Sequence, residues 1–183
     1  LCSVARDGLG GVWDAATGAR LATMRSHDAP MRAGVVVAGR DRIATLADDG
    51  SVRLWGTTAS GSFFPIPGHR ERVWTSAWRS DGRRLVTSSE DGTARVVDPS
   101  TGGTLLVLRG HRRSVLDAGF SAHDATIWTA SRDGTVRLWD ASDGRTTAEL
   151  SAGGPIAVAG APPDGSCVVV ATASRIVGWS IPD

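Results

Sequence analysis

The chain has 183 residues, 41% hydrophobic and 21% charged, with 23 glycines and 8 prolines. This balance is too apolar for a disordered chain and too rich in turn residues for a long coiled coil, so it predicts a turn-rich globular protein. Twenty basic residues oppose nineteen acidic ones, and the net charge of +1 provides no general field that would gather nucleic acid or an anionic membrane.

Cysteine usage and hydropathy exclude further classes. Cys2 and Cys167 lie far apart without a neighbouring Cys or His, which argues against a disulfide framework and against a zinc site. We therefore expect two buried thiols, no metal and no cofactor. No apolar run approaches the ~20 residues that span a bilayer, and no signal peptide is visible. These features predict a cytoplasmic protein without a membrane partner.

A repeat begins near the N-terminal end and continues along the chain. Asp-Gly pairs start at residues 7, 49, 91 and 133, and histidines stand at 27, 69 and 111, so both series share a spacing of 42 residues. A Trp follows the Asp by six residues at positions 13, 55 and 139, whereas Val97 takes that place in the third series. A period of this length predicts a stack of similar supersecondary units.

Each unit has the pattern of short strands. Residues 135–139 alternate between Val and Leu on one side and Thr, Arg and Trp on the other, which is the period of a β-strand. Asp133-Gly134 and Asp143-Gly144 favour tight turns on either side, because Gly tolerates positive φ. The unit at 111–152 is therefore predicted to hold four strands, near 115–120, 126–131, 135–140 and 146–150.

These residues carry a resemblance to a known family. Gly68-His69 and Gly110-His111 at repeat starts, Trp13-Asp14 and Trp139-Asp140 at repeat ends, and the segment SRDGTVRLWD at 131–140 resemble the WD-repeat β-propeller family. The resemblance covers essentially the whole chain. Four departures are clear: Gly56 after Trp55, Val97 in place of Trp, Ser26 before His27, and Gly153-Gly154 without a His.

The resemblance implies an all-β fold, a single propeller segment over 1–183 made of four-stranded antiparallel blades. Dividing the length by the period gives about 4.4 blades in an open arc. Complete blades are expected at 27–68, 69–110 and 111–152, and partial blades at 1–26 and 153–183. The absence of Lys, Asn and Tyr, whose codons are AT-rich, adds the expectation of a GC-rich bacterial source, and the partial end blades that of a C-terminal fragment of a larger propeller.

Within each blade the resemblance implies a structural tetrad, in which an Asp in the turn between the second and third strands accepts a hydrogen bond from the His. The expected members are His27, Thr45, Asp49 and Trp55; His69, Thr87 and Asp91; and His111, Thr129, Asp133 and Trp139. Such sets contain the raw material of nucleophilic catalysis, but a catalytic site is built once and these sets recur, so we expect no catalytic residue. Because Val97 removes one donor, we expect Asp91 to be held less well than Asp133.

The resemblance also places a partner-binding top face just after each His and just before each turn Asp. The residues expected there are Arg32, Asp48, Arg72, Trp74, Glu90, Leu116 and Arg132. Trp and Arg are the types enriched at binding hot spots, although Trp74 could instead pack between blades. His123-Asp124 is expected to be a surface turn pair, and the clustered arginines that follow each Gly-His step a solvated rim.

Three functions remain open from the sequence. The first is a non-enzymatic scaffold or sensor module that binds a protein or peptide on the top face, without nucleic acid or a small-molecule substrate. The second is the regulatory propeller of a larger enzyme with a kinase, protease or NTPase domain upstream. The third is a structural fragment without activity of its own. Gly-rich stretches such as Gly102-Gly103 lack the nucleotide-binding patterns that would favour another class.

Overall fold

A computed structural model describes residues 1–25, 27–36, 42–56, 63–66, 68–162 and 165–181. These residues form eighteen strands and no helix, arranged in five antiparallel sheets of three, four, four, four and three strands. The described part of the chain therefore holds no helix that could cross a membrane. The all-β prediction is confirmed.

Every sheet is built from consecutive strands, each paired with the next along the chain. The first sheet holds β1 (Cys2–Val4), β2 (Leu9–Trp13) and β3 (Arg20–Arg25). The second holds β4 (Met31–Val36), β5 (Arg42–Ala47), β6 (Val52–Gly56) and β7 (Phe63–Ile66). The third holds β8 (Val73–Trp78), β9 (Leu85–Ser89), β10 (Ala94–Val97) and β11 (Thr104–Leu108). The fourth holds β12 (Val115–Phe120), β13 (Thr126–Ser131), β14 (Thr135–Asp140) and β15 (Thr146–Ser151), and the fifth holds β16 (Ile156–Gly160), β17 (Cys167–Thr172) and β18 (Ile176–Ser180).

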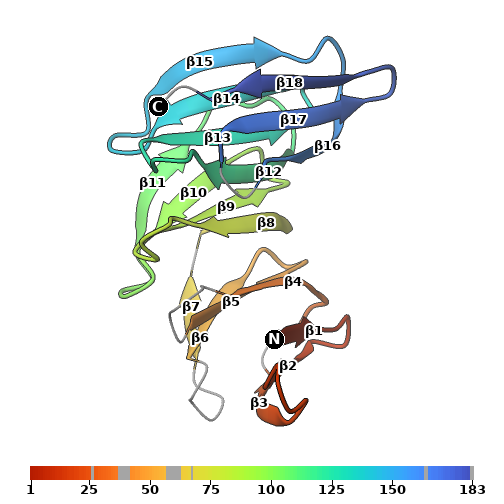
Figure 1. Cartoon of the computed structure of the whole chain (residues 1–183), viewed down its shortest axis with the longest axis vertical. Coiled ribbons are helices and arrows are strands. Elements are labelled where there is room, and N and C mark those ends of the chain that lie inside the picture. Colours follow the sequence, from red (N-terminus) through yellow and green to blue (C-terminus); the bar gives the residue numbers. More distant parts are fainter. Residues whose placement is uncertain (26, 37–41, 57–62, 67, 163–164, 182–183) are drawn as a thin grey trace.

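The sheets follow one another as an open arc. β4, β8, β12 and β16, the first strands of the last four sheets, contact one another in sequence, and β1 contacts β4. The first and last sheets lie at opposite ends of the long axis of the molecule (Figure 1). This arrangement of partial and complete blades confirms the predicted propeller segment.

Four hydrophobic cores fill the spaces between consecutive sheets. On β14, Val136 and Leu138 point into the core shared with the fifth sheet, whereas Trp139 points into the core shared with the third sheet. In a strand that is buried on both faces, successive side chains point to opposite faces and so contact the two neighbouring sheets in turn. Val97 occupies the corresponding place in the core between the second and third sheets, where it is fully buried.

The Asp-Gly turns bring each sheet against the start of the next unit. Gly50 has a φ of +82°, and a Cβ at this position would lie 2.7 Å from the carbonyl oxygen of Glu71. Gly92 has the same conformation, with a φ of +80°. The positive φ favours glycine at both positions, and the close approach adds a second requirement at Gly50, which explains why glycine recurs with the period.

Two expectations for individual residues are wrong. Cys2 and Cys167 are only partly buried free thiols, because both lie on sheets at the ends of the arc. Asp124 is not a surface residue: it is 8% exposed and adopts a φ of +60°. Its carboxylate accepts hydrogen bonds from the N–H and hydroxyl of Ser80 and lies 3.6 Å from Nε of Arg79, so it connects the third and fourth sheets. His123 is exposed, as expected.

Candidate partner-binding face

The four expected tetrad residues of the fourth sheet form a continuous hydrogen-bonded chain. The indole N–H of Trp139 donates to Oγ1 of Thr129 at 2.8 Å, Oγ1 lies 2.7 Å from Nε2 of His111, and Nδ1 of His111 lies 3.0 Å from Oδ2 of Asp133. Asp133 also accepts from the N–H of Arg112 and from the N–H and hydroxyl of Thr135. The chain therefore links the second and third strands to the turn between them.

The direction of donation follows from the chemistry of the groups. A carboxylate can only accept, so Nδ1 of His111 carries the proton, and the neutral ring accepts at Nε2 from the Thr129 hydroxyl. Burial lowers the pKa of His111, which keeps the ring neutral. Burial also opposes ionisation of Asp133, but the hydrogen bonds from Arg112, Thr135 and His111 outweigh it and lower its pKa to about 2. The His111 side chain is 1% exposed, so no substrate reaches this His-Asp pair from solvent.

In the third sheet the corresponding hydrogen-bonded series ends at the threonine, because it has no Trp. Nδ1 of His69 lies 3.0 Å from Asp91, and Nε2 lies 2.9 Å from Oγ1 of Thr87. Val97 offers no donor, and the Thr87 hydroxyl lies 3.5 Å from the carbonyl oxygen of Arg95.

The expectation that Asp91 is held less well is wrong. Asp91 accepts from the N–H of Arg70 and from the N–H and hydroxyl of Thr93, as well as from His69, which is the same set of donors that Asp133 has. Burial opposes its ionisation, but these hydrogen bonds hold its pKa well below the ordinary range. The absence of the Trp removes a hydrogen bond only from Thr87, which lies at the other end of the hydrogen-bonded series from Asp91.

The second sheet brings its four expected residues together, but one of the expected contacts is replaced by another. Trp55 donates to Oγ1 of Thr45 at 2.8 Å, and Thr45 lies 2.8 Å from Nε2 of His27. Nδ1 of His27, however, lies 2.8 Å from Oγ of Ser51, and it is Ser51 that donates to Asp49 at 2.6 Å. The predicted direct bond from His27 to Asp49 is thus replaced by a relay through Ser51. Burial and the nearby positive charge of Arg53 lower the pKa of His27 to about 4.

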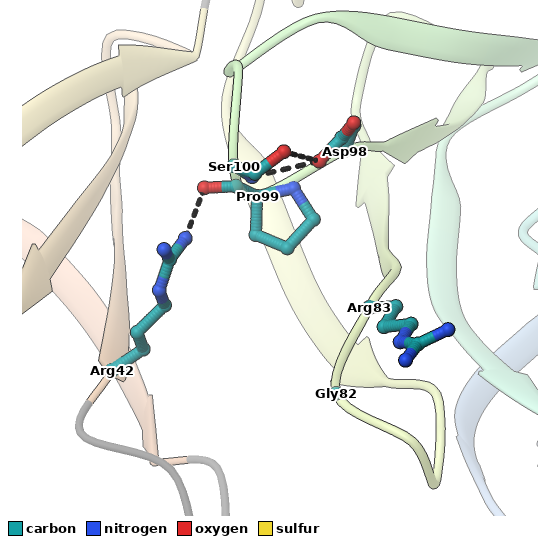
Figure 2. Close-up of a pocket in the computed structure, with 6 residues that line it drawn as sticks. All are labelled: Arg42, Gly82, Arg83, Asp98, Pro99 and Ser100. Carbon is teal, nitrogen blue, oxygen red and sulfur yellow. Dashed lines mark hydrogen bonds between the residues drawn. The ribbon is translucent and has the colours of Figure 1, made fainter.

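A hollow beside the strand ends of the second and third sheets is the first alternative site. It has a volume of about 350 Å³ and is lined by Arg42, Gly82, Arg83, Asp98, Pro99 and Ser100 (Figure 2). Among the residues that line it, Arg42 donates to the carbonyl oxygen of Pro99, and Ser100 donates to Asp98.

The repeat assigns this hollow a structural role. Arg84, which is 42 residues after Arg42, donates in the same way to the carbonyl oxygen of Ala141, which is 42 residues after Pro99, at 2.7 Å. A second hollow lies beside this bond, lined by Arg84, Asp124 and Ala141 among others. An arginine that recurs at both junctions holds neighbouring sheets together. The hollow is therefore one copy of a repeated structural contact, not a unique binding site. Sequence reasoning missed this pair, although its 42-residue spacing was a usable signal.

The expected partner-binding residues lie at two recurring backbone features. Arg32, Trp74 and Leu116 are each the extra residue of a β-bulge near the start of β4, β8 and β12. A bulge leaves one residue outside the regular pairing and redirects its side chain, and bulges are common beside binding sites. The bulge was not predicted, since its pattern is not visible in side-chain types.

The turn residues are held beside these bulges. The N–H groups of Asp48, Glu90 and Arg132 donate to the carbonyl oxygens of Pro30, Arg72 and Ser114, respectively, at 2.8–3.1 Å. Each bond joins the turn between the second and third strands to the segment that enters the first strand. The scaffold thus repeats, while the side chains that it presents change from sheet to sheet.

Six of the seven expected residues form a connected set, which we call the rim cluster: Arg32, Asp48, Arg72, Trp74, Glu90 and Arg132. Arg32 binds Asp48 through two hydrogen bonds of 2.6 and 3.1 Å, and Nε of Arg72 lies 2.8 Å from the same carboxylate. Arg72 lies 3.8 Å from Glu90. The two arginines, with Arg32 the stronger, lower the pKa of Asp48.

Trp74 connects these ion pairs to the fourth sheet. The guanidinium carbons of Arg72 and Arg132 lie 5.1 and 5.5 Å from the centre of its ring, within the range of cation–π attraction. Trp74 is partly exposed, whereas Leu116 is a partly buried residue that packs against the core between the fourth and fifth sheets. The cluster therefore spans three sheets, and Leu116 stands apart from it.

No group of three or more His, Cys, Asp or Glu residues within the described residues could hold a metal ion.

No curated protein matches the chain. A family model, WD domain, G-beta repeat, matches residues 61–98 and 102–140. Each matched segment includes the last strand of one sheet, β7 or β11, and the first three strands of the next sheet. Two segments of the chain are thus similar to the WD40 repeat, and their boundaries are offset from the sheets by one strand.

Proposed function

We propose that the chain is a non-enzymatic scaffold that binds a protein or peptide partner on the face carrying the rim cluster. WD40 repeats generally serve protein interaction, which supports the class of function. One observation carries the location: at a backbone position shared by the second, third and fourth sheets, the bulge residue changes from Arg32 to Trp74 to Leu116. Variable side chains on a constant, rigid scaffold are the usual arrangement of a recognition surface.

The chemistry of the face favours protein over nucleic acid. Arg32 and Arg72 are both paired with carboxylates, so their charges are already compensated. A phosphate backbone would compete with Asp48 and Glu90, whereas a protein surface can place apolar groups on Trp74 and polar groups on the ion pairs. Trp and Arg together are the residue types that dominate protein interfaces.

The test is selection of binding peptides from a library of random twelve-residue peptides displayed on phage, with the full chain as bait. We expect enriched peptides whose affinity falls about 30-fold or more for Trp74→Ala, since truncation of a hot-spot residue costs ~2 kcal/mol or more. Arg83→Ala is the matched control, because Arg83 is exposed and lies at the hollow of Figure 2, away from the rim cluster. Peptides that bind Trp74→Ala as tightly as the unmodified chain would contradict the proposed location.

A further inference from the structure

The positive charges of the rim cluster are not all compensated. Arg32 and Arg72 share Asp48, and Arg72 also faces Glu90. Among the described residues Arg132 has no ion pair, and its side chain is exposed. Within the described part of the chain, the Arg132 side chain interacts only with the ring of Trp74. Arg132 is therefore the one cation of the cluster whose donors remain available.

At the turn position of Arg132, the charge in the fourth sheet is opposite to the charge in the second and third sheets. Asp48, Glu90 and Arg132 occupy the same turn position in three successive sheets and make the same backbone hydrogen bond. In the second and third sheets the carboxylate at this position pairs with an arginine of the cluster. In the fourth sheet an arginine takes the position, so this turn does not supply the carboxylate that the other two turns supply.

The surroundings of Arg132 add to the positive charge. Arg112 and Arg113 are exposed and precede Ser114, whose carbonyl oxygen accepts the N–H of Arg132. Neither has an ion pair among the described residues. The nearest acidic residue in sequence, Asp133, is committed to His111, Thr135 and the Arg112 N–H. This side of the face therefore attracts an anion.

Trp74 supplies an apolar neighbour for that anion. The residue is partly exposed, although its indole N–H is buried and has no acceptor in the described structure. An apolar ligand group that packs on the exposed part of the ring can bury area of a large, rigid side chain. Trp74 is the bulge residue of β8, and its ring lies near both the compensated arginine, Arg72, and the uncompensated one, Arg132.

We infer that the partner presents an Asp or Glu side chain to Arg132, next to an apolar side chain that packs on Trp74. The guanidinium binds a carboxylate through two parallel hydrogen bonds, which suits a single side chain in a fixed position. This inference rests on the proposed function, because it specifies the partner of the same face. It also specifies the orientation of the partner on that face, since the acidic residue of the partner lies over the fourth sheet, not over the second.

The test uses the peptides selected above, synthesised with amidated C-termini so that only side-chain carboxylates are present. We expect enrichment of Asp or Glu beside Trp, Phe or Leu, and a loss of affinity of about tenfold when that acidic residue is changed to its amide. A second selection uses Arg132→Glu, which we expect to enrich Lys or Arg at the same place. The substitution is compatible with the fold, since Glu90 occupies the equivalent turn position.

Arg113→Glu is the matched control, since it makes the same charge change on a neighbouring exposed arginine and should retain the acidic preference. Equal affinity for acid and amide peptides, or the same reversal with Arg113→Glu, would overturn the inference. Peptides that depend on Trp74 but show no acidic preference would overturn the inference and leave the proposed function intact. Peptides that do not depend on Trp74 would overturn both.

Discussion

The third and fourth sheets are built on the same plan, and they differ in the last member of their internal hydrogen-bonded chain. Trp139 donates to Thr129 in the fourth sheet, whereas Val97 leaves Thr87 without that donor in the third. The His-Asp ends of the two chains nevertheless have matching donors and nearly identical distances. The hydrogen-bonded network therefore has two separable ends, one held by the turn and one held by the core.

The strongest test of this separation removes the turn end from both sheets. Asp91→Ala and Asp133→Ala should each cost ~3 kcal/mol or more of unfolding free energy, because each leaves several buried donors without an acceptor. The two losses should be equal, since the donors are the same. Chemical denaturation of the two variants measures them.

Asp143→Ala provides the control for these losses, because Asp143 lies in an exposed turn and its carboxylate contacts only Arg145 among the described residues. Its replacement should change the unfolding free energy little. A loss at Asp91 that is clearly smaller than the loss at Asp133 would show that the Trp end does support the carboxylate, contrary to the separation.

The junction between the two sheets provides the next test. Thr75 of β8 donates to Asp117 of β12 at 2.8 Å, although the two residues occupy equivalent positions of the repeat. The N–H of Ala118 also donates to this carboxyl. Burial outweighs both bonds and raises the pKa of Asp117 to about 6.

The raised pKa predicts a pH-dependent effect of Asp117→Asn. Above pH 6 the native state holds a carboxylate that burial disfavours, so the neutral amide should stabilise the protein by ~2–3 kcal/mol at pH 8, as a shift of about two pKa units implies. The gain should shrink as the pH falls through 6, to about 0.5 kcal/mol at pH 4, where the carboxyl is protonated in the native state and about half protonated in the unfolded state. Denaturation at pH 8 and pH 4 measures the difference, and a gain that does not depend on pH would contradict the assignment.

The parts of the molecule that follow from local pattern were predictable. The four strands of the fourth sheet lie where alternation and the Asp-Gly turns predict them, with one added residue, Ser151, at the end of β15. The members of each tetrad are also brought together. These features depend on spacing and residue type, which the sequence shows directly.

Contacts between sheets were not predictable in the same way. Whether His27 meets Asp49 or Ser51 depends on small shifts in a turn, and both are plausible acceptors by residue type. The burial of Asp124 depends on the position of Ser80 in the neighbouring sheet. The rim cluster depends on bulges, which change the direction of a side chain without changing the residue pattern.

The core end of the network gives the finest test, because it isolates one hydrogen bond. Trp139→Phe removes the N–H that donates to Thr129 and keeps most of the buried ring, so it should cost ~1 kcal/mol for the bond in addition to the loss of ring volume. Trp128, on the same sheet, is equally buried, but its N–H has no acceptor in the described structure. Trp128→Phe therefore carries the same volume change, relieves a buried unpaired donor, and should cost less than Trp139→Phe. Denaturation of both variants measures this difference. Equal losses for the two variants would mean that the bond to Thr129 contributes nothing, and that the sheet with Val97 lacks only volume.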